Sequence, residues 1–381
     1  LIETAFAEWA SEIRLPAKLR LMRMAKAVDG EVFGMLTANP MLRSPIKLDL
    51  QLIEADRVAN PDARILIDDA VDGIQFDRFG NPVRYLVLRR HPGQCGFTLA
   101  LDGYDRVPAE AMVHWFRSDR PGQHRGIPEI TPALPLFAQL RRYTLAVLGA
   151  AETAADFAAV LFTDAPANGE AASVEPMDIV ELEKRMATVL PDGWKLGQIK
   201  AEQPGTTYGE FKRELLNEIA RCLNMPFNVA AGNSSGYNYA SGRLDHQTYF
   251  KSIRVEQADC NNVVLDALLN AWLTEARLLA DFSFLAGAES LEHQWFWDGT
   301  EHVDPAKEAS AQAQRLANHT TTLACEYARQ GKDWETELRQ RAKEKQLMKE
   351  LGLTEAQVQP TQELQPQEED DTDVEDQRQA A

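Results

Sequence analysis

The residues best suited to do chemistry are three histidines and three carboxylates in the last third of the chain. Imidazole and carboxylate groups together form the ligand sets of catalytic zinc sites, so this group could support metal-assisted hydrolysis. Its spacing matches no recognised ligand pattern, and Asp304-Pro305 is typical of a helix N-cap followed by the first helical residue. We therefore interpret these residues as surface or capping groups and predict no metal site. The six residues are His293, Asp298, Glu301, His302, Asp304 and His319.

A second group, in residues 114–128, combines two histidines with three arginines in the stretch HWFRSDRPGQHRGIP. His114 or His124 could act as a general base, but the sequence fixes no partner carboxylate for either. The interpretation that we favour is a strand followed by a basic loop that orients the next long helix. In that interpretation the arginines could make bidentate contacts to carboxylates of a neighbouring chain. These possible inter-subunit contacts are Arg117, Arg120 and Arg125.

No sequence signature of an enzyme with a defined mechanism is present. The chain has no phosphate-binding glycine loop of the Walker type, no GxGxxG after a strand, and neither HExxH nor GxSxG. Its four cysteines lie far apart and form no CxxC pair, which indicates unpaired thiols in a reduced compartment. We therefore expect no catalytic residues and no cofactor.

The most informative stretch is a loop rich in glycine, serine, asparagine and tyrosine that follows Pro226. A helix is expected to stop at this proline, and a much longer helix to start near Ser241. Glycine frees the backbone, and exposed tyrosines can stack or hydrogen-bond without demanding a sequence. A solvated connector is the alternative, and the tyrosines favour a contact surface. The candidate contact residues are Asn233, Ser234, Ser235, Tyr237, Asn238, Tyr239 and Arg243.

Length and charge limit the classes of protein to which the chain can belong. Its 381 residues predict two or three domains, and no apolar run approaches the ~20 residues of a membrane span. The net charge is −18, of which the tail after residue 353 contributes nine acids and one arginine. An acidic body argues against ordinary duplex binding but suits a protein past which DNA must move without sticking. The chain opens on Leu1 without an initiator Met, which we interpret as a processed N-terminus.

The first third of the chain has the pattern of a mixed α and β domain. Residues 1–36 are expected to form a helical stretch that is interrupted at Pro16 and ends in a strand. Residues 48–54 alternate with period two, as a half-buried strand does, and residues 73–90 have the pattern of a hairpin. Met112–Phe116 predicts a further short strand.

The rest of the chain is predominantly helical. The longest predicted helix would reach ~60 Å, so we expect a kink near Asp259–Asn262. After Thr354, high charge and few apolar residues predict disorder. The expected helices are Pro132–Phe162, Pro176–Val189, Tyr208–Leu223, Ser241–Ala280, Lys307–Arg329 and Trp334–Leu351, with a short strand at Gly193–Ile199.

Several motifs, taken in order along the chain, resemble those of the lambda-type portal proteins of tailed bacteriophages. Each motif is weak alone, but their order over roughly residues 5–345 makes the resemblance specific. One departure is Ala240, where the family usually has serine. The motifs are Asp29-Gly30-Glu31-Val32, the Asp72–Asp77 hairpin, the stretch 114–128, the Asn238–Arg243 segment and the box Val303–Glu308.

This resemblance implies a ring, commonly of twelve subunits, at one vertex of the capsid. It implies a channel through which double-stranded DNA passes without sequence specificity, driven by the terminase large subunit. The head–tail connector and the major capsid protein are the other implied partners, with no membrane involved. The implied location is the virion, after assembly in the host cytoplasm. Two alternatives stay open from the residues: a metal-assisted hydrolase, and a capsid adaptor that forms no ring.

The resemblance also implies an α+β portal fold with a defined order of parts. The tunnel loop is the part expected to meet DNA at the narrowest point of the channel. The expected parts are a mixed α/β wing (1–130), the first stem helix (131–162), the clip (163–206), the second stem helix (207–226), the tunnel loop (227–242), the long wing helix (243–280), a helical crown (281–353) and a disordered acidic tail (354–381).

Overall fold

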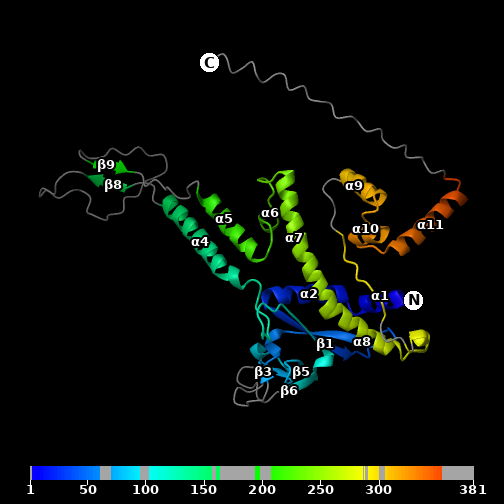
Figure 1. The fold of residues 1–381 in the computed structure, drawn as a ribbon. Helices are drawn as coiled ribbons and strands as arrows, with labels where there is room; N and C mark the ends of the chain where they lie inside the picture. Colours follow the sequence, from blue (N-terminus) through cyan, green and yellow to red (C-terminus); the bar gives the residue numbers. More distant parts are fainter. Residues whose placement is uncertain are drawn as a thin grey trace, which may run out of the picture. The chain divides into compact units, whose positions relative to one another are not determined.

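The computed structural model describes residues 2–60, 70–94, 103–156, 160–163, 194–197, 207–285, 287, 291–299 and 305–353. The chain divides into two compact units, Leu1–Ser290 and Leu291–Ala381, and each is described by itself. Their helices and strands are labelled in Figure 1. The content is mixed α and β, as the sequence predicts.

Two helices and a three-stranded antiparallel sheet open the first unit (Figure 1). The predicted interruption is confirmed: Arg14 takes a left-handed conformation (φ 56°), and Pro16 lies in the first turn of the next helix, where its missing N–H costs nothing. Strand β1 is central in the order β2-β1-β7, and α2 packs on it. The elements are α1 (Ile2–Glu12), α2 (Leu15–Val28), β1 (Glu31–Ala38), β2 (Leu48–Ile53) and β7 (Met112–Phe116).

A second antiparallel sheet, of four strands, contains the predicted hairpin. Its core side chains include Ile74 and Tyr85, which cluster with Phe33 of the first sheet, so the two sheets share one hydrophobic core. Short 3-10 turns connect the strands at Ala55–Arg57, Pro92–Gln94 and Ala109–Ala111. The strands are β3 (Ala70–Val71), β4 (Ile74–Phe76), β5 (Pro82–Leu88) and β6 (Tyr104–Pro108), in the order β3-β4-β5-β6.

Two long helices follow, α4 (Leu134–Asp156) after a 3-10 turn at Thr131–Ala133, and α5 (Thr207–Cys222). They lie side by side and meet through the Tyr143 ring, whose centroid is 4.5 Å from that of Phe211. The helix predicted over Pro132–Phe162 is too long. Its last residues form strand β8 (Val160–Thr163), which pairs with β9 (Trp194–Gly197), because β-branched and aromatic residues favour a strand.

The predicted loop after Pro226 is shorter than the sequence indicates. Pro226 caps a short helix, α6 (Phe227–Ala231), and the next helix, α7 (Tyr239–Cys260), starts before Ser241. The predicted irregularity near Asp259–Asn262 is a π-helical turn at Asn261–Leu265, which joins α7 to α8 (Asp266–Ala276). A 3-10 segment at Ala280–Leu285 follows, so the long helix ends at Ala276 instead of Ala280.

The second unit is helical over most of its described residues 305–353, whereas the described residues 291–299 form neither helix nor strand. The single helix predicted over Lys307–Arg329 is in fact two, because His319 takes a left-handed conformation and Thr322 caps a new helix start. The helix over Trp334–Glu350 has no buried residue, which agrees with its high content of Lys, Glu and Arg. The helices are α9 (Pro305–Ala317), α10 (Leu323–Arg329) and α11 (Trp334–Glu350).

Several predictions lie outside the described residues: the helix at Pro176–Val189, most of the segment 163–206, the Asp304 cap and the tail 354–381. The predicted strand at Gly193–Ile199 is confirmed over Trp194–Gly197. None of the helices in the described part of the chain combines the length and the apolar character that a membrane span needs.

Candidate functional site

The loop between α6 and α7 consists of residues 232–238 and is held by local hydrogen bonds. Gly232 ends α6 in a left-handed conformation (φ 61°), which glycine adopts without steric cost. The Asn233 side chain accepts a hydrogen bond from the Ser235 N–H (2.9 Å), and the Tyr237 N–H donates to the Ser234 carbonyl (3.0 Å). The loop therefore has a defined turn structure in the free chain.

The far end of the loop is a capping box. The Asn238 side chain accepts from the Ser241 N–H (2.8 Å), and the Ser241 hydroxyl accepts from the Asn238 N–H (3.2 Å). Two free donors at the start of α7 are satisfied in this way. Asn238 is thus a helix cap and Tyr239 the first residue of α7, so neither belongs to a flexible loop as predicted.

The predicted contact residues that remain in the loop are turned outward. Asn233, Ser234 and Ser235 are exposed, Tyr237 is half-buried, and Arg243 is exposed on the first turns of α7. The side chain of Tyr239 lies outside the described part. The loop thus offers amide, hydroxyl and phenol groups, which can hydrogen-bond to phosphate and sugar without reading bases.

The base of the loop is fixed to the long helix by Asn228 of α6. This side chain is 7% exposed, and its Nδ2 lies 3.0 Å from Nε2 of His246 on α7. The Met225 N–H donates to the Ala220 carbonyl (2.9 Å) and closes the end of α5 just before α6. The two contacts together connect α5, α6 and α7. A force on the loop would therefore be transmitted to both long helices.

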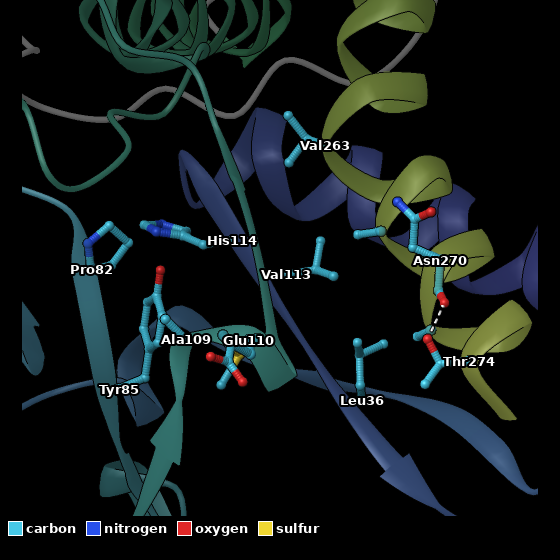
Figure 2. Close-up of a pocket in the computed structure, with 13 residues that line it drawn as sticks. Leu36, Pro82, Tyr85, Ala109, Glu110, Val113, His114, Val263, Asn270 and Thr274 are labelled. Atoms are coloured by element: carbon cyan, nitrogen blue, oxygen red, sulfur yellow. Dashed lines mark hydrogen bonds between the residues drawn. The ribbon is translucent and has the colours of Figure 1, made fainter. Parts of the chain in front are cut away.

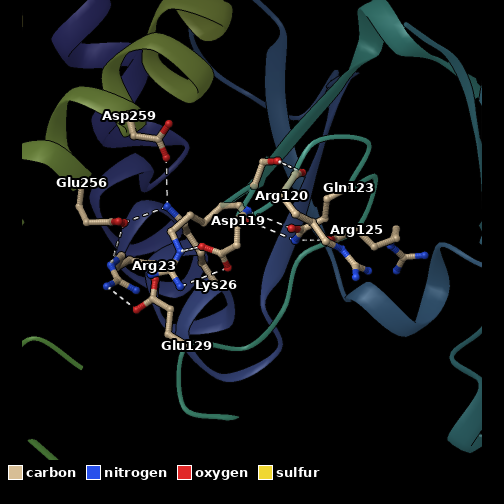
Figure 3. A network of polar contacts seen from close by, with 11 residues as sticks. Arg23, Lys26, Asp119, Arg120, Gln123, Arg125, Glu129, Glu256 and Asp259 are labelled. Carbon is tan, nitrogen blue, oxygen red and sulfur yellow. Dashed lines mark hydrogen bonds and ion pairs between the residues drawn. The ribbon is translucent and has the colours of Figure 1, made fainter. Parts of the chain in front are cut away.

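The basic stretch after β7 is pinned inside its own chain. The Arg125 guanidinium lies 2.6 Å from a Glu31 carboxylate oxygen and donates to the carbonyls of Val58 (2.9 Å) and Asp72 (2.6 Å). Arg125 is labelled in Figure 3. Its donors are used within the subunit, which disfavours the predicted contact of Arg125 with a neighbouring chain.

Arg117 and Arg120 differ in their surroundings. Arg117 forms an ion pair with Asp119 (2.7 Å). Both side chains are nearly half exposed, so this pair contributes little to stability. Arg120 is exposed, and within the described part of the chain its side chain has no ion pair. Only Arg120 keeps its full set of donors for a contact outside the subunit.

His114 is structural, in agreement with the favoured interpretation. Its side chain is 7% exposed, stacks on Phe33 (4.2 Å between centroids) and Phe116 (4.4 Å), and its Nε2 lies 2.9 Å from Glu31. Burial lowers the pKa of His114, although the Glu31 carboxylate opposes this. Burial alone would raise the pKa of Glu31, but hydrogen bonds from His114 and Arg125 hold it below its ordinary value. A buried, paired imidazole is poorly suited to general-base catalysis.

Acid is expected to destabilise the first unit through this pair. The folded-state pKa of His114 is depressed, so the unfolded imidazole takes up a proton first and stability falls as pH drops below about 6.5. The folded-state pKa of Glu31 is also depressed, and its contribution is lost in turn at lower pH. We expect the urea midpoint to fall between pH of about 7 and about 5, and His114→Gln, which keeps a donor to Glu31, to flatten this first step. An equally steep decline in the variant would contradict the assignment to His114.

A groove of about 520 Å³ lies beside His114, between the sheet residue Val113 and α8 (Figure 2). Its ionisable lining groups, within the described part, are Tyr85, Glu110 and His114. Burial raises the pKa of Tyr85 to about 12, so this phenol stays protonated. The groove thus lacks a described nucleophile with an adjacent free base.

The histidines and carboxylates weighed as a metal site in the sequence are only partly described. His293, Asp298 and His319 are described, whereas Glu301, His302 and Asp304 lie outside the described residues. Within the described residues, no three His, Cys, Asp or Glu side chains gather as a metal site would require.

The sequence missed a buried cationic cluster that ties α2 to α7. Lys26 is 1% exposed and donates to Glu256 (2.8 Å) and Asp259 (3.0 Å), and its ammonium lies 4.6 Å from the centroid of the Trp115 ring. Trp115 Nε1 donates to the same Asp259 (2.7 Å), and Arg23 joins α2 to Glu256 at 3.7 Å (Figure 3). The C-terminal end of α7, the helix that follows the loop, is therefore anchored to α2 and β7.

A comparison with known protein families finds one match over most of the chain. The family described as "Phage portal protein, lambda family" matches residues 1–257, about two thirds of the sequence. A "Probable portal protein" of Halomonas phage phiHAP-1 is 24% identical over an alignment of 297 residues that covers 74% of this chain. The chain spans 56% of the length of that relative.

Two solved structures of gene transfer agent particles contain chains with a weaker likeness. One, from the virion of the native particle, has a TM-score of 0.40 and 15% identity, covering 76% of this chain and 71% of that chain. The other, from the neck of the native particle computed with C12 symmetry, has a TM-score of 0.35 and 15% identity, covering 60% and 59%. The family match over residues 1–257 is the decisive finding: this chain belongs to the lambda family of phage portal proteins.

Proposed function

We propose that the chain is the subunit of a portal ring, expected from its family to be dodecameric, through which the phage genome is packaged and ejected. The observation that carries the proposal is the family match over residues 1–257. This range includes the two sheets of β1–β7, α4, α5 and the loop of residues 232–238. Portal proteins are structural components of the virion and not enzymes, and as a member of the family this chain is one of them.

The parts of the subunit follow from the order of its elements. We assign residues 1–130 to the wing, α4 and α5 to the paired stem, and the segment 163–206 between them to the clip. The clip would face the terminase large subunit during packaging and the head–tail connector afterwards. The helices after residue 281 would form the crown, and the wing would meet the major capsid protein.

Ring formation is supported by apolar side chains that this chain leaves uncovered. On α4, Leu145 and Leu148 are 57% and 54% exposed, and Leu134 lies on the same face, three helical turns earlier, at 53%. Tyr143, which contacts α5, points to the other side of the helix, because residues two apart are separated by about 200°. The leucines thus form a face turned away from α5 and suited to a second subunit.

Helix α7 shows the same arrangement. Leu244 and Val255 are 64% and 69% exposed and lie on one face, since eleven residues make about three turns. In a closed ring every subunit offers two different surfaces, so one copy can cover these residues of the next. A neighbouring copy would thereby bury two large apolar side chains of α7 that are exposed in the single chain.

The channel is proposed to work by repulsion combined with contact. An acidic chain, with a net charge of −18, keeps phosphates from binding tightly along the bore. The loops of residues 232–238, one from each subunit, would touch the duplex through Asn233, Ser234, Ser235 and Tyr237, with Arg243 behind them. Such contacts go to the backbone, which suits a channel that must accept any sequence.

Charge on the exposed face of α4 tests the ring. The double variant Leu145→Glu/Leu148→Glu is expected to stay folded, because both side chains are more than half exposed, and to shift the ring to monomers. The measurement is native mass spectrometry over a range of protein concentrations. The control is Leu351→Glu, at a site that is 65% exposed and lies beyond the residues matched by the family. Rings of unchanged stability in the double variant would contradict the assignment of this face.

A further inference from the structure

A cavity of about 680 Å³ lies in the first unit between α1, the loop before β2 and the 3-10 segment that follows α8. Three of its lining residues are acidic, Glu8, Glu12 and Asp281, and one, Arg43, is basic. The aromatic residues Trp272 and Phe282 also line it, together with Ala5, Ser44, Pro45 and Ile46. The cavity therefore combines an apolar floor with a negative rim and suits a ligand that is aromatic and basic.

The surroundings of this α1 cavity are unfinished in the free chain. Trp272 is fully buried, and its Nε1 has no acceptor within the described part of the chain. Next to the lining residues in the sequence, Met41, Leu278 and Phe284 are 86%, 84% and 59% exposed. Exposed apolar side chains of this size, close in sequence to the lining residues, mark an interaction surface, whereas the buried Trp272 indole is out of reach of a partner.

The complementary shape occurs on the same chain, at the tip of the β4–β5 hairpin. Phe79 is 74% exposed, and the guanidinium carbon of Arg78 lies 4.6 Å from the centroid of its ring. The turn below them is rigid, because the Asp77 carboxylate accepts from the Phe79 N–H (2.8 Å), the Asn81 N–H (2.9 Å) and the Asn81 side chain (3.0 Å). The hairpin tip (Arg78–Asn81) is thus a preformed aromatic and basic knob that covers nothing in its own subunit.

We propose that the hairpin tip of one subunit inserts into the α1 cavity of its neighbour. Phe79 packs toward Phe282, and Arg78 pairs with Asp281 and Glu8. The inference rests on the proposed ring and adds a specific contact between its wings.

A second copy of this chain is the occupant that the observations favour. The tip carries Arg78 and an exposed Phe79, the cavity carries Glu8, Asp281 and Phe282, and the two are built from different elements of one subunit. Each copy therefore offers both halves of a heterologous contact, the type of interface that closes a ring by rotation. Another virion protein as the occupant is an outcome that the experiment distinguishes.

Photo-crosslinking from the tip tests the contact directly. Phe79 is replaced by p-benzoylphenylalanine in the full chain, the assembled ring is isolated and irradiated, and the linked peptides are identified by mass spectrometry. We expect links between subunits to α1, to residues 41–46 or to residues 278–284. The same photoreactive residue in place of Phe137 on α4 is the control and is expected to give no link to the cavity.

The outcomes separate this inference from the ring itself. Rings whose tip links elsewhere, to another protein or to nothing overturn the inference and leave the proposed function standing. Failure of the unmodified chain to form rings overturns both. As a second readout, Arg78→Glu is expected to raise the protein concentration needed for half-assembly about tenfold, and Asp281→Arg to restore it. Arg20→Glu, a charge reversal at an exposed position of α2, is the control and is expected to have little effect on assembly. If Arg20→Glu weakened assembly as much as Arg78→Glu, the proposed pairing of Arg78 would be contradicted.

Discussion

Replacing residues 233–237 with glycine and serine is expected to leave the ring intact and to prevent DNA packaging. The loop supports no core, since its side chains are exposed or half-buried, so stability should not change. Gly232 and Asn238 are kept because they end α6 and cap α7. If the loop guides the duplex, particles with the variant should have normal necks and little packaged DNA, which is measured in a complementation assay with the variant gene supplied in trans.

Single substitutions at Tyr237 show which property of the loop matters. Tyr237→Phe keeps the ring and is expected to package normally, whereas Tyr237→Ser removes the flat surface and is expected to reproduce much of the defect. Gly236→Ala, at an exposed loop position outside the proposed contacts and with open space for a methyl group, is the matched control and should package normally. Full packaging by the glycine–serine replacement would show that the loop does not contact DNA in the way proposed.

Lys26→Met is expected to lower the free energy of unfolding by about 3 kcal/mol, because it removes the cation between Glu256 and Asp259 and leaves Glu256 only the more distant Arg23, at 3.7 Å. Lys26 is 1% exposed, while Glu256 and Asp259 are 26% and 40% exposed, which holds the loss toward the lower end of the range for buried pairs. Methionine retains the apolar stem, so packing changes little. Urea unfolding followed by tryptophan fluorescence measures the effect, since Trp115 lies in the cluster.

Two further variants isolate the electrostatic part of this loss. Arg89→Met removes an ion pair to Asp105 whose side chains are 60% and 58% exposed, and should cost less than about 1 kcal/mol. Adding Glu256→Gln and Asp259→Asn to Lys26→Met removes the uncompensated charges and should recover much of the stability. A single Lys26→Met variant as stable as the wild type would show that the cluster does not anchor α7.

Local patterns in the sequence predict most of the elements correctly. The apolar–polar alternation in residues 48–54 predicts a strand, and the turn residues within 73–90 predict a hairpin. The structure confirms the strand and the hairpin. The end of α4 was predicted wrongly, because alanine- and leucine-rich helices give no sign of a strand pairing with residues far ahead, at Trp194–Gly197.

The candidate site is less visible in the sequence because distant residues build it. Lys26 and Asp259 are 233 positions apart, and nothing near either residue indicates that they meet. Arg125 looks like a free surface cation until the structure brings Glu31 and three backbone carbonyls to it. The loop was recognised from its composition, but the capping box that removes Asn238 and Tyr239 from it depends on where α7 begins.

The most direct test of the account is native mass spectrometry of the purified full chain together with negative-stain electron microscopy of the same sample. The account predicts closed rings with a central opening and a mass that is a high multiple of the 42.6 kDa subunit. Compact particles with no axial opening, or monomers that stay apart at the highest concentration reached, would contradict it.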